Sequence, residues 1–159
     1  MRIGYGYDVH RMKAGRKCVL CGVTVPADAG PDGHSDADAP VHALADAVLG
    51  AAALGDIGAH FPDDDERWKD ADSIGLLKAV WDKASALGYV LGNADVTVIL
   101  QSPRIAPYVA HMRENIANAL NTSVDRVSVK ATTEEGLGLT GGGLAVAASA
   151  VVLLEENAI

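Results

Sequence analysis

The sequence predicts an α/β sandwich in which helices cover one face of a mixed four-stranded sheet. Apolar residues at strand spacing alternate along the chain with apolar residues at helix spacing, a pattern typical of a two-layer domain. Hydrophobic residues make up 49% of the chain and charged residues 21%, as in ordinary globular proteins. We therefore expect a single domain over residues 1–159, with a core of Ala, Val, Leu and Ile because only 4% of the residues are aromatic.

The first part of the chain predicts two extended segments and a long helix. Residues 2–9 alternate as a strand does, and residues 17–25 form a second extended segment. Residues 27–38 are rich in Asp, Gly and Pro and are expected to form a loop. Asp38 can cap a helix that has a proline in its first turn, and Gly55 is expected to end this helix.

The rest of the chain predicts two more helices and three more strands. After a polar loop over 56–65, a helix begins at Asp72 or Ser73 and ends at Gly88. The later elements are a strand over 96–101, a break at 102–107, a helix to Leu120, a strand over 127–132, turns at 133–138 and 140–143, and a strand over 145–154. We expect the sheet to be ferredoxin-like.

Charge and cysteine content restrict partners and compartment. A net charge of −8 argues against nucleic acid or an anionic membrane surface as a partner. The longest apolar run, 144–154, is shorter than the roughly 20 residues that span a bilayer, and the N-terminal segment lacks the apolar core of a secretory signal. Cys18 and Cys21 have no second Cys or His pair nearby and are expected to be structural thiols. These features together predict a cytoplasmic protein.

Three residues are candidates for a metal site. Asp8 and His10 alternate on the first strand, so both side chains leave the same face. His42 lies in the first turn of the following helix and can complete the set. One carboxylate and two imidazoles from two rigid elements match a zinc site with an open fourth position. Asp46 lies one turn after His42 and is expected to orient its ring.

The polar motifs, taken one by one, leave their alternatives open. Asp8 and His10 could be an exposed pair on a strand as well as a pair of metal ligands. His34 could be a hydrogen-bonded loop residue as well as a site residue. Glu134 and Glu135 could form a solvated acidic turn, and Thr132 and Thr133 could satisfy the backbone of a turn.

Four ordered motifs together identify a resemblance. They are Tyr7-Asp8-Val9-His10, then H-S-D-x-D-x-x-x-H-A-L-x-D-A from His34, G-A-A-A-L-G-D-I-G-x-x-F-P-D from Gly50, and V-K-A-T-T-x-E-x-L-G from Val129. In this order and spacing the sequence resembles the family of 2-C-methyl-D-erythritol 2,4-cyclodiphosphate synthases, over residues from Met1 to about Leu154.

The resemblance implies a reaction of the non-mevalonate isoprenoid pathway. The family converts 4-diphosphocytidyl-2-C-methyl-D-erythritol 2-phosphate to 2-C-methyl-D-erythritol 2,4-cyclodiphosphate. In this reaction the 2-phosphate attacks the β-phosphorus, and CMP leaves as the ring closes. The resemblance thus implies that the chain is a phosphorus–oxygen lyase. Such an intramolecular transfer requires positioning and charge neutralisation, with no covalent enzyme intermediate.

The resemblance also implies cofactors. It places Asp8, His10 and His42 on a zinc ion, whose fourth position is left for a phosphate oxygen. It places Glu135 on a second divalent ion, Mg²⁺ or Mn²⁺. Two ions on the diphosphate would stabilise the attacked phosphorus and the leaving CMP.

The resemblance further implies the residues that contact the substrate. His34 and Thr133 fall on catalytic positions that stabilise the transition state. The pocket for the cytidine comes from a neighbouring subunit, so that a homotrimer shares its active sites across its interfaces. The implied substrate-binding residues are Asp8, His10, His34, Ser35, Asp56, Gly58, Phe61, Asp63, Asp65, Leu100, Pro103, Arg104, Ile105, Ala106, Thr132, Thr133 and Glu135.

The sequence departs from the family at three positions. The family often has an aromatic residue at 139, Arg at 142 and an acidic residue at 144, whereas this chain has Leu139, Gly142 and Leu144. In relatives the arginine lies at the trimer axis, beside a cavity that can hold an isoprenoid diphosphate. We therefore expect a weaker anion site there, or none.

Two other functions fit the same residues. A zinc-dependent phosphodiesterase or pyrophosphatase would use the metals to activate water, but the sequence offers no obvious general base for that water. A non-catalytic trimeric binding protein would hold a structural zinc ion, and metal removal would then unfold it. The open three-ligand set favours catalysis.

Overall fold

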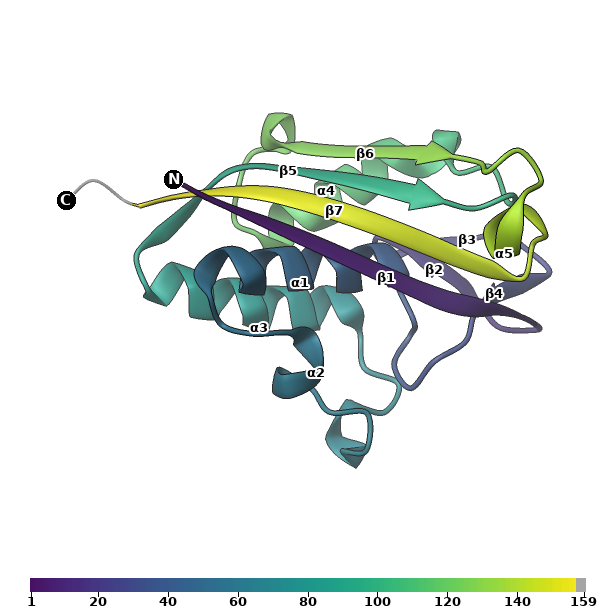
Figure 1. Ribbon diagram of the computed structural model, residues 1–159, viewed down its shortest axis with the longest axis horizontal. Coiled ribbons are helices and arrows are strands. Elements are labelled where there is room, and N and C mark those ends of the chain that lie inside the picture. Colours follow the sequence, from purple (N-terminus) through teal and green to yellow (C-terminus); the bar gives the residue numbers. More distant parts are fainter. Residues whose placement is uncertain (157–159) are drawn as a thin grey trace.

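The computed structural model describes residues 1–156 as two layers, a curved sheet and the helices packed against it (Figure 1). Neighbouring strands of the five-stranded sheet run antiparallel, except for the last pair, which runs parallel. The strands in spatial order are β4 (Ala29–Pro31), β1 (Arg2–Ala14), β7 (Ala145–Glu156), β5 (Tyr89–Ile99) and β6 (Val127–Thr132).

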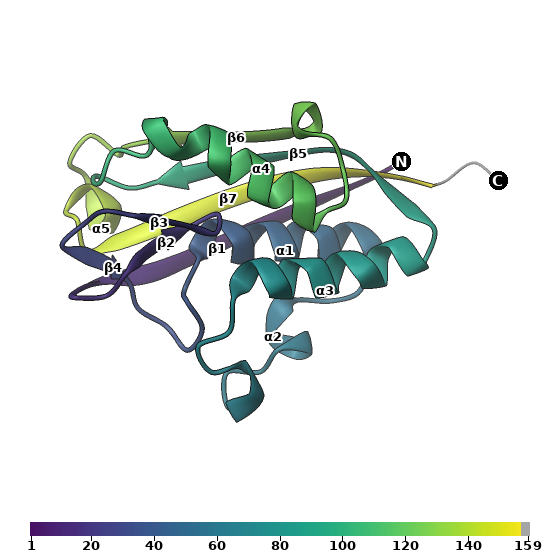
Figure 2. The ribbon, with the colours of Figure 1, turned by 180° about the vertical axis from the view of Figure 1, so that it is seen from behind.

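The helices cover one face of the sheet, which confirms the predicted layering (Figure 2). α1 (Ala39–Ala52) packs on β1 and β7, α4 (Val109–Ala119) packs on β6, and α3 (Ser73–Ala86) packs against both helices. The other face of β1 exposes apolar side chains at alternate positions. No helix within residues 1–156 has the length and apolar character needed to cross a membrane.

The sheet differs from the prediction in two respects. It has a fifth strand, because β4 forms within residues 27–38, a segment expected to be a loop, and pairs with the end of β1. The expected ferredoxin-like arrangement is wrong, because that fold follows the order β-α-β-β-α-β. Here α4 carries the chain from β5 to β6, so these two strands are parallel neighbours.

The second extended segment is a hairpin outside the main sheet. β2 (Cys18–Leu20) and β3 (Val23–Val25) pair antiparallel, and Cys21 (φ 50°) and Gly22 (φ 72°) form the turn between them. Both cysteines are buried free thiols, in agreement with a structural role. Burial raises the pKa of the Cys18 thiol to about 11, and the nearby Asp38 carboxylate adds to this effect.

Two segments expected to be loops contain short helices, and α1 ends earlier than predicted. Ala53 adopts the left-handed conformation (φ 58°) that ends α1, ahead of Gly55. The short helical elements of the described residues are α2 (Ile57–His60), α5 (Gly138–Gly141) and the 3₁₀ turns η1 (Glu66–Trp68), η2 (Ala106–Tyr108) and η3 (Val124–Arg126).

Asp38 caps α1 as predicted and also attaches the β2–β3 hairpin to it. Its fully buried carboxylate accepts hydrogen bonds from the backbone N–H groups of Val41 (3.3 Å), Cys21 (2.8 Å) and Gly22 (2.7 Å). Burial raises the pKa of Asp38 to about 7, against the opposing effect of the Gly22 and Cys21 N–H groups.

Two glycines let α1 lie directly on β1. A Cβ atom added to Gly4 would lie 1.8 Å from the Ala47 carbonyl oxygen, and one added to Gly6 would lie 1.8 Å from that of Ala43. Any larger residue at these two positions would therefore separate the helix from the strand. This close approach brings the first turn of α1 over the middle of β1.

Candidate metal centre

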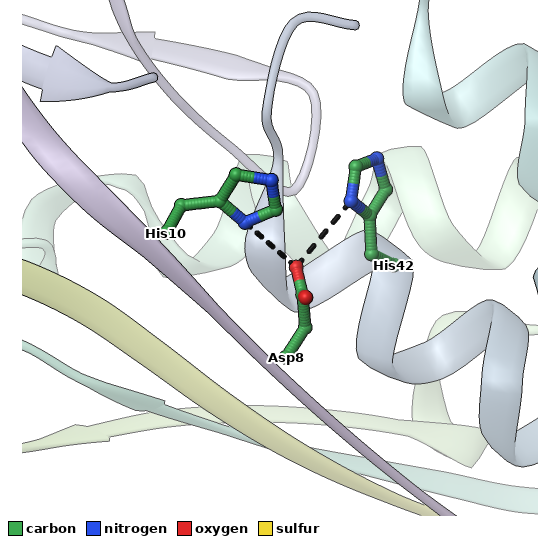
Figure 3. Close-up of side chains that lie close together, drawn as sticks. All are labelled: Asp8, His10 and His42. Carbon is green, nitrogen blue, oxygen red and sulfur yellow. Dashed lines mark ion pairs between the residues drawn. The ribbon is translucent and has the colours of Figure 1, made fainter. Parts of the chain in front are cut away.

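Asp8, His10 and His42 meet at this junction of β1 and α1, as the sequence predicts (Figure 3). Asp8 Oδ2 lies 2.8 Å from His10 Nδ1 and 3.3 Å from His42 Nδ1. One potential ligand atom from each side chain lies within 4.8 Å of the other two. The two imidazole rings are 5.3 Å apart and tilted by 58°, so both Nδ1 atoms can face the carboxylate.

The donor atoms of this cluster fit a metal ion better than they fit each other. Asp8 Oδ2 and His10 Nδ1 are buried, and within the described residues neither has a hydrogen bond of suitable geometry despite their proximity. Buried polar atoms without partners are rare in folded proteins. Two imidazole nitrogens and a carboxylate oxygen, with no thiolate, form the type of ligand set found in catalytic zinc sites.

The electrostatics of the cluster also favour a cation. Burial acts to raise the pKa of Asp8, but the two facing imidazoles lower it to about 2, so the carboxylate is ionised at neutral pH. For His42, burial acts to lower the pKa, but Asp8, together with Asp38 and Asp36, outweighs this effect and the pKa is raised. A proton on either ring would compete with a metal for the same nitrogen, so metal affinity is expected to fall at acidic pH.

The far nitrogen of the His42 ring contacts two serines, and the prediction for Asp46 is wrong. His42 Nε2 lies 2.9 Å from Ser73 Oγ and 3.2 Å from Ser35 Oγ. Asp46 instead accepts a hydrogen bond from the Ile57 backbone N–H at 2.7 Å, which fixes the start of α2.

A cavity of about 320 Å³ opens beside the three candidate ligands. His34, Ser35, Gly58, Phe61 and Asp63 line it, so the structure brings these predicted residues together with the ligands. The His34 ring also approaches the Asp65 carbonyl oxygen, at 3.4 Å from Nε2.

Several residues of the cavity wall were missed by the sequence-based reasoning. Trp68 packs edge-on against Phe61, with ring centroids 4.9 Å apart. It belongs to a short charged segment without apolar periodicity, so no sequence signal marks it. The other wall residues not expected from the sequence are Asp32, Gly33, Ile57 and Leu76.

Two predicted carboxylates are engaged in local structure near the cavity. Asp56 caps α2 by accepting a hydrogen bond from the Ala59 N–H at 2.9 Å. Asp65 accepts hydrogen bonds from the side chain of Arg67, which lowers its pKa. These bonds order the chain around the cavity.

The remaining predicted residues gather at a second pocket of about 260 Å³, at the ends of β5 and β6. Glu135 lies just beyond it in a left-handed conformation (φ 53°), and its N–H donates to Thr133 Oγ1 at 3.2 Å. The predicted residues that line this pocket are Leu100, Pro103, Arg104, Ile105, Ala106, Thr132 and Thr133.

Within one chain the two pockets lie apart. Val9 of β1 pairs with Ala147 of β7, Ala147 pairs with Ile99 of β5, and Ile99 pairs with Thr132 of β6. Three strand spacings therefore separate Val9 from Thr132, a distance of roughly 14 Å. The fold does not bring Thr133 and Glu135 of a chain to the metal ligands of the same chain.

Comparisons with known proteins agree with the geometry. The model of the YgbB family matches residues 1–155. A 2-C-methyl-D-erythritol 2,4-cyclodiphosphate synthase from Moorella thermoacetica is 61% identical over 157 residues, which are 99% of this chain and 96% of that protein.

Two solved structures share the fold. The bifunctional IspDF from Campylobacter jejuni matches with a TM-score of 0.94 and 41% identity, over 98% of this chain and 42% of that one. A 2C-methyl-D-erythritol-2,4-cyclodiphosphate synthase in a CDP-bound form matches with a TM-score of 0.89 and 39% identity, over 97% of this chain and 100% of that one.

Proposed function

The chain belongs to the YgbB family, and we propose that it carries out the family's reaction at the centre formed by Asp8, His10 and His42. Its relatives are lyases that make 2-C-methyl-D-erythritol 2,4-cyclodiphosphate for isoprenoid biosynthesis by the non-mevalonate pathway. The chain converts 4-diphosphocytidyl-2-C-methyl-D-erythritol 2-phosphate to this cyclic diphosphate and CMP.

The reaction exchanges one phosphorus–oxygen bond for another. An oxygen of the 2-phosphate bonds to the β-phosphorus, and the bond from the β-phosphorus to the oxygen that bridges it to the α-phosphorus breaks. That oxygen and its electron pair leave with CMP. Because both reacting groups belong to one molecule, the protein has to fold the substrate back on itself and offset its negative charge.

The metal that we propose for Asp8, His10 and His42 is zinc. A divalent ion bound there would neutralise charge on the diphosphate and polarise the attacked phosphorus. The buried, unpartnered oxygen of Asp8 and nitrogen of His10 support this assignment. We assign a second divalent ion, Mg²⁺ or Mn²⁺, to Glu135, whose exposed carboxylate accepts a hydrogen bond from Thr133 Oγ1 at 3.4 Å.

The side chains of the metal cavity would position the phosphates and the erythritol. His34 and Ser35 offer hydrogen-bond donors beside the metal ligands, suited to phosphate oxygens whose charge changes during the transfer. Gly58 lets the backbone approach a ligand closely, and Asp56 offers a carboxylate for the erythritol hydroxyls. The segment with Phe61, Asp63 and Asp65 would cover the phosphates.

We propose that the second pocket belongs to the active site of a neighbouring subunit. Its residues from Leu100 to Ala106 would bind the cytidine, while Thr132 and Thr133 would contact the phosphates. We call the cavity at Asp8, His10 and His42 the metal half-site and the second pocket the cytidine half-site. The separation of roughly 14 Å between the two half-sites of one chain supports this division. The related synthase solved with CDP shows that a protein of this fold can bind a cytidine nucleotide.

The exposed face of the sheet supports assembly into a homotrimer. Ile3 is 72% exposed and Tyr5 62% exposed, and Tyr7, Val9 and Val151 continue the same apolar surface. A contiguous apolar patch of this kind on a soluble protein is typical of a subunit interface. In a closed cyclic trimer, each metal half-site would meet the cytidine half-site of the next subunit.

The buried free thiols of Cys18 and Cys21 fit a reducing compartment, for which we propose the cytoplasm.

The anion site of the trimer cavity is expected at the segment that contains Gly142. Leu139 and Leu144 line an apolar pocket on the exposed side of β1, and Gly142 lies close to Leu144. Because Gly142 carries no charge, we propose that an anion site in the trimer cavity is weak or missing.

The convergence of Asp8, His10 and His42 beside a cavity with phosphate-binding donors carries the assignment, and the reaction products test it. The cytidine substrate is incubated with the zinc- and magnesium-loaded protein, and the products are identified by ³¹P nuclear magnetic resonance. We expect the cyclic diphosphate and CMP in equal amounts. Linear phosphates in place of the ring would indicate hydrolysis and would contradict the cyclase assignment.

A further inference from the structure

Ser73 lies behind the His42 ring, on the side away from Asp8. It is the first residue of α3, it is fully buried, and its Oγ lies 2.9 Å from His42 Nε2. The same hydroxyl donates a hydrogen bond to Asp36 Oδ1. His42, Ser73 and Asp36 thus form a continuous chain from the metal centre to a carboxylate.

The direction of this chain follows from its proton count. The Ser73 hydroxyl has a single proton, and that proton is given to Asp36. Its oxygen can therefore only accept from the His42 ring, so Nε2 must carry the hydrogen and donate it. In a neutral ring the lone pair then lies on Nδ1, the nitrogen that faces Asp8.

We infer that Ser73 and Asp36 are positioning residues that hold the His42 ring with Nδ1 ready to bind the metal. This inference rests on the metal centre proposed above and adds two residues that do not touch the ion. Metal-binding histidines usually donate their other N–H to a carboxylate or carbonyl group, which fixes the tautomer and the ring orientation. Here a serine hydroxyl stands between the histidine and the carboxylate.

The surrounding contacts make this chain rigid. Asp36 Oδ2 also accepts from the Ser73 backbone N–H at 3.0 Å, and the Asp36 backbone N–H donates to the Ala71 carbonyl at 3.1 Å. Both of these bonds join the loop before α1 to the segment where α3 begins. Ser35 lies farther from His42 Nε2, at 3.2 Å, and its oxygen also accepts from the Ala37 N–H.

The first test uses the unaltered protein. Long-range ¹H–¹⁵N spectra of the zinc-loaded protein identify which nitrogen of each histidine binds zinc. We expect zinc on Nδ1 of His42 and a proton on Nε2 that exchanges with water more slowly than the ring protons of the exposed His111. Zinc on Nε2, or a proton that exchanges as fast as in His111, would overturn the inference.

The second test removes the links one at a time. Ser73→Ala, Asp36→Asn and the double variant are stripped of metal, and zinc dissociation constants are measured by competition with a chromophoric chelator. We expect Ser73→Ala to weaken zinc binding roughly 10- to 100-fold. Because the two residues act through one chain, the double variant should lose little more than Ser73→Ala alone. Losses that simply add would mean that Asp36 acts independently of Ser73.

A matched control lies on the same helix. Ser85 donates to the Asp82 carbonyl on the exposed side of α3, so Ser85→Ala should leave zinc affinity unchanged. Circular dichroism and cobalt absorption spectra show whether each variant keeps its fold and its metal geometry. Failure of the unaltered protein to bind zinc would overturn the metal centre itself. Tight zinc binding by both the unaltered protein and a folded Ser73→Ala variant would overturn only the positioning role.

Discussion

At Asp8, two opposing effects act on one carboxylate. Burial favours the neutral form, yet the His10 and His42 rings lower its pKa to about 2. The Oδ2 atom of this half-buried carboxylate is shielded from solvent. Its negative charge is therefore stabilised by a positive partner, which is either a protonated ring or a metal ion. A zinc ion bound by all three side chains would supply this positive charge. Both imidazole rings would then be neutral, because a histidine must be deprotonated at the nitrogen that binds a metal.

Replacing His42 tests whether this cluster is a catalytic metal site. His42→Ala should weaken zinc binding by more than about 100-fold, because the change removes a ligand and not merely an outer partner. Turnover should become undetectable, while the circular dichroism spectrum stays that of the unaltered protein. Zinc content, activity and spectrum are measured on the same preparation.

The control for this variant is His111→Ala on the exposed side of α4, which should keep both zinc and activity. Chelation of the unaltered protein should likewise abolish activity without unfolding it. Unfolding on chelation would instead identify a structural zinc site.

The sequence could predict the ligands at this scale, but not their neighbours. Strand alternation places Asp8 and His10 on one face, whatever the rest of the chain does. Helical spacing put Asp46 on the face of His42, but the side chain bonds to Ile57, which the loop after α1 brings close. Ser73 is 31 residues from His42 and meets it only because α3 begins beside α1.

At the scale of elements, the centre depends on how closely α1 approaches β1. Gly4 and Gly6 face the carbonyl oxygens of Ala47 and Ala43, at distances that leave no space for a side chain. The sequence contains these glycines, and a glycine inside a strand allows another backbone to approach closely. It does not say that α1 is the partner, because that follows from the order of strands in the sheet.

A methyl group at Gly6 should therefore disturb the metal site from a distance. In Gly6→Ala the new Cβ would collide with backbone, which cannot rotate away as a flexible side chain can. Overpacking of this kind costs about 1–3 kcal/mol of unfolding free energy, and zinc affinity should fall as His42 moves away from Asp8. Denaturant unfolding and zinc competition measure the two effects.

The matched control for Gly6 is a glycine of α1 that takes no part in the contact with β1. Gly50 lies within α1 and faces open space, so Gly50→Ala should raise stability by about 1 kcal/mol and leave zinc affinity unchanged. If Gly6→Ala behaved like Gly50→Ala, the close packing of α1 on β1 would not set the ligand geometry.

Asp38 connects the hairpin to α1 and should make stability depend on pH. Its folded-state pKa of about 7 lies above its usual value of 3.8, so between these values the folded protein binds more protons than the unfolded chain. The unfolding free energy should therefore fall as pH rises from about 4 to about 7, by at most about 4 kcal/mol from this group. Urea unfolding of metal-free protein across this range measures it.

The Asp38→Asn variant isolates the contribution of this carboxyl. Its amide would face the Gly22 N–H, so the variant should be less stable at every pH. Its unfolding free energy should nevertheless fall less between pH 4 and pH 7 than that of the unaltered protein. Equal pH dependence in both proteins would assign the effect to other groups.

At the scale of the whole molecule, the two layers could be predicted from the sequence, but the number of strands in the sheet and their pairing could not. Periodic apolar patterns identify β1, α1, α3 and β6, because each buries a stripe at its own period. β7 is identified instead by a continuous apolar run, most of which is buried. The short strand β4 has no such stripe and forms only where the end of β1 offers it a partner. The parallel pairing of β5 with β6 depends on where α4 packs, which local patterns do not encode.

In the proposed trimer, residues of two neighbouring chains form each active site. Trimers that contain two different variants of the chain test this. His42→Ala damages the metal half-site and Thr133→Ala damages the opposite half-site. When the two inactive variants are co-expressed with different tags and purified together, some sites should combine the intact halves of both. Purification through both tags leaves only trimers that contain both variants. Each of these has one of its three sites built from two intact halves, so about a third of the sites should recover.

The control for this experiment pairs two variants of the same half-site. His34 and His42 both line the metal cavity, so trimers mixed from His34→Ala and His42→Ala contain no chain with an intact metal half and should stay inactive. Recovery only with Thr133→Ala would show that neighbouring chains share each site. No recovery in the isolated mixed trimers would mean that each chain completes its own site, by a movement that carries Thr133 across the roughly 14 Å from β6 to β1.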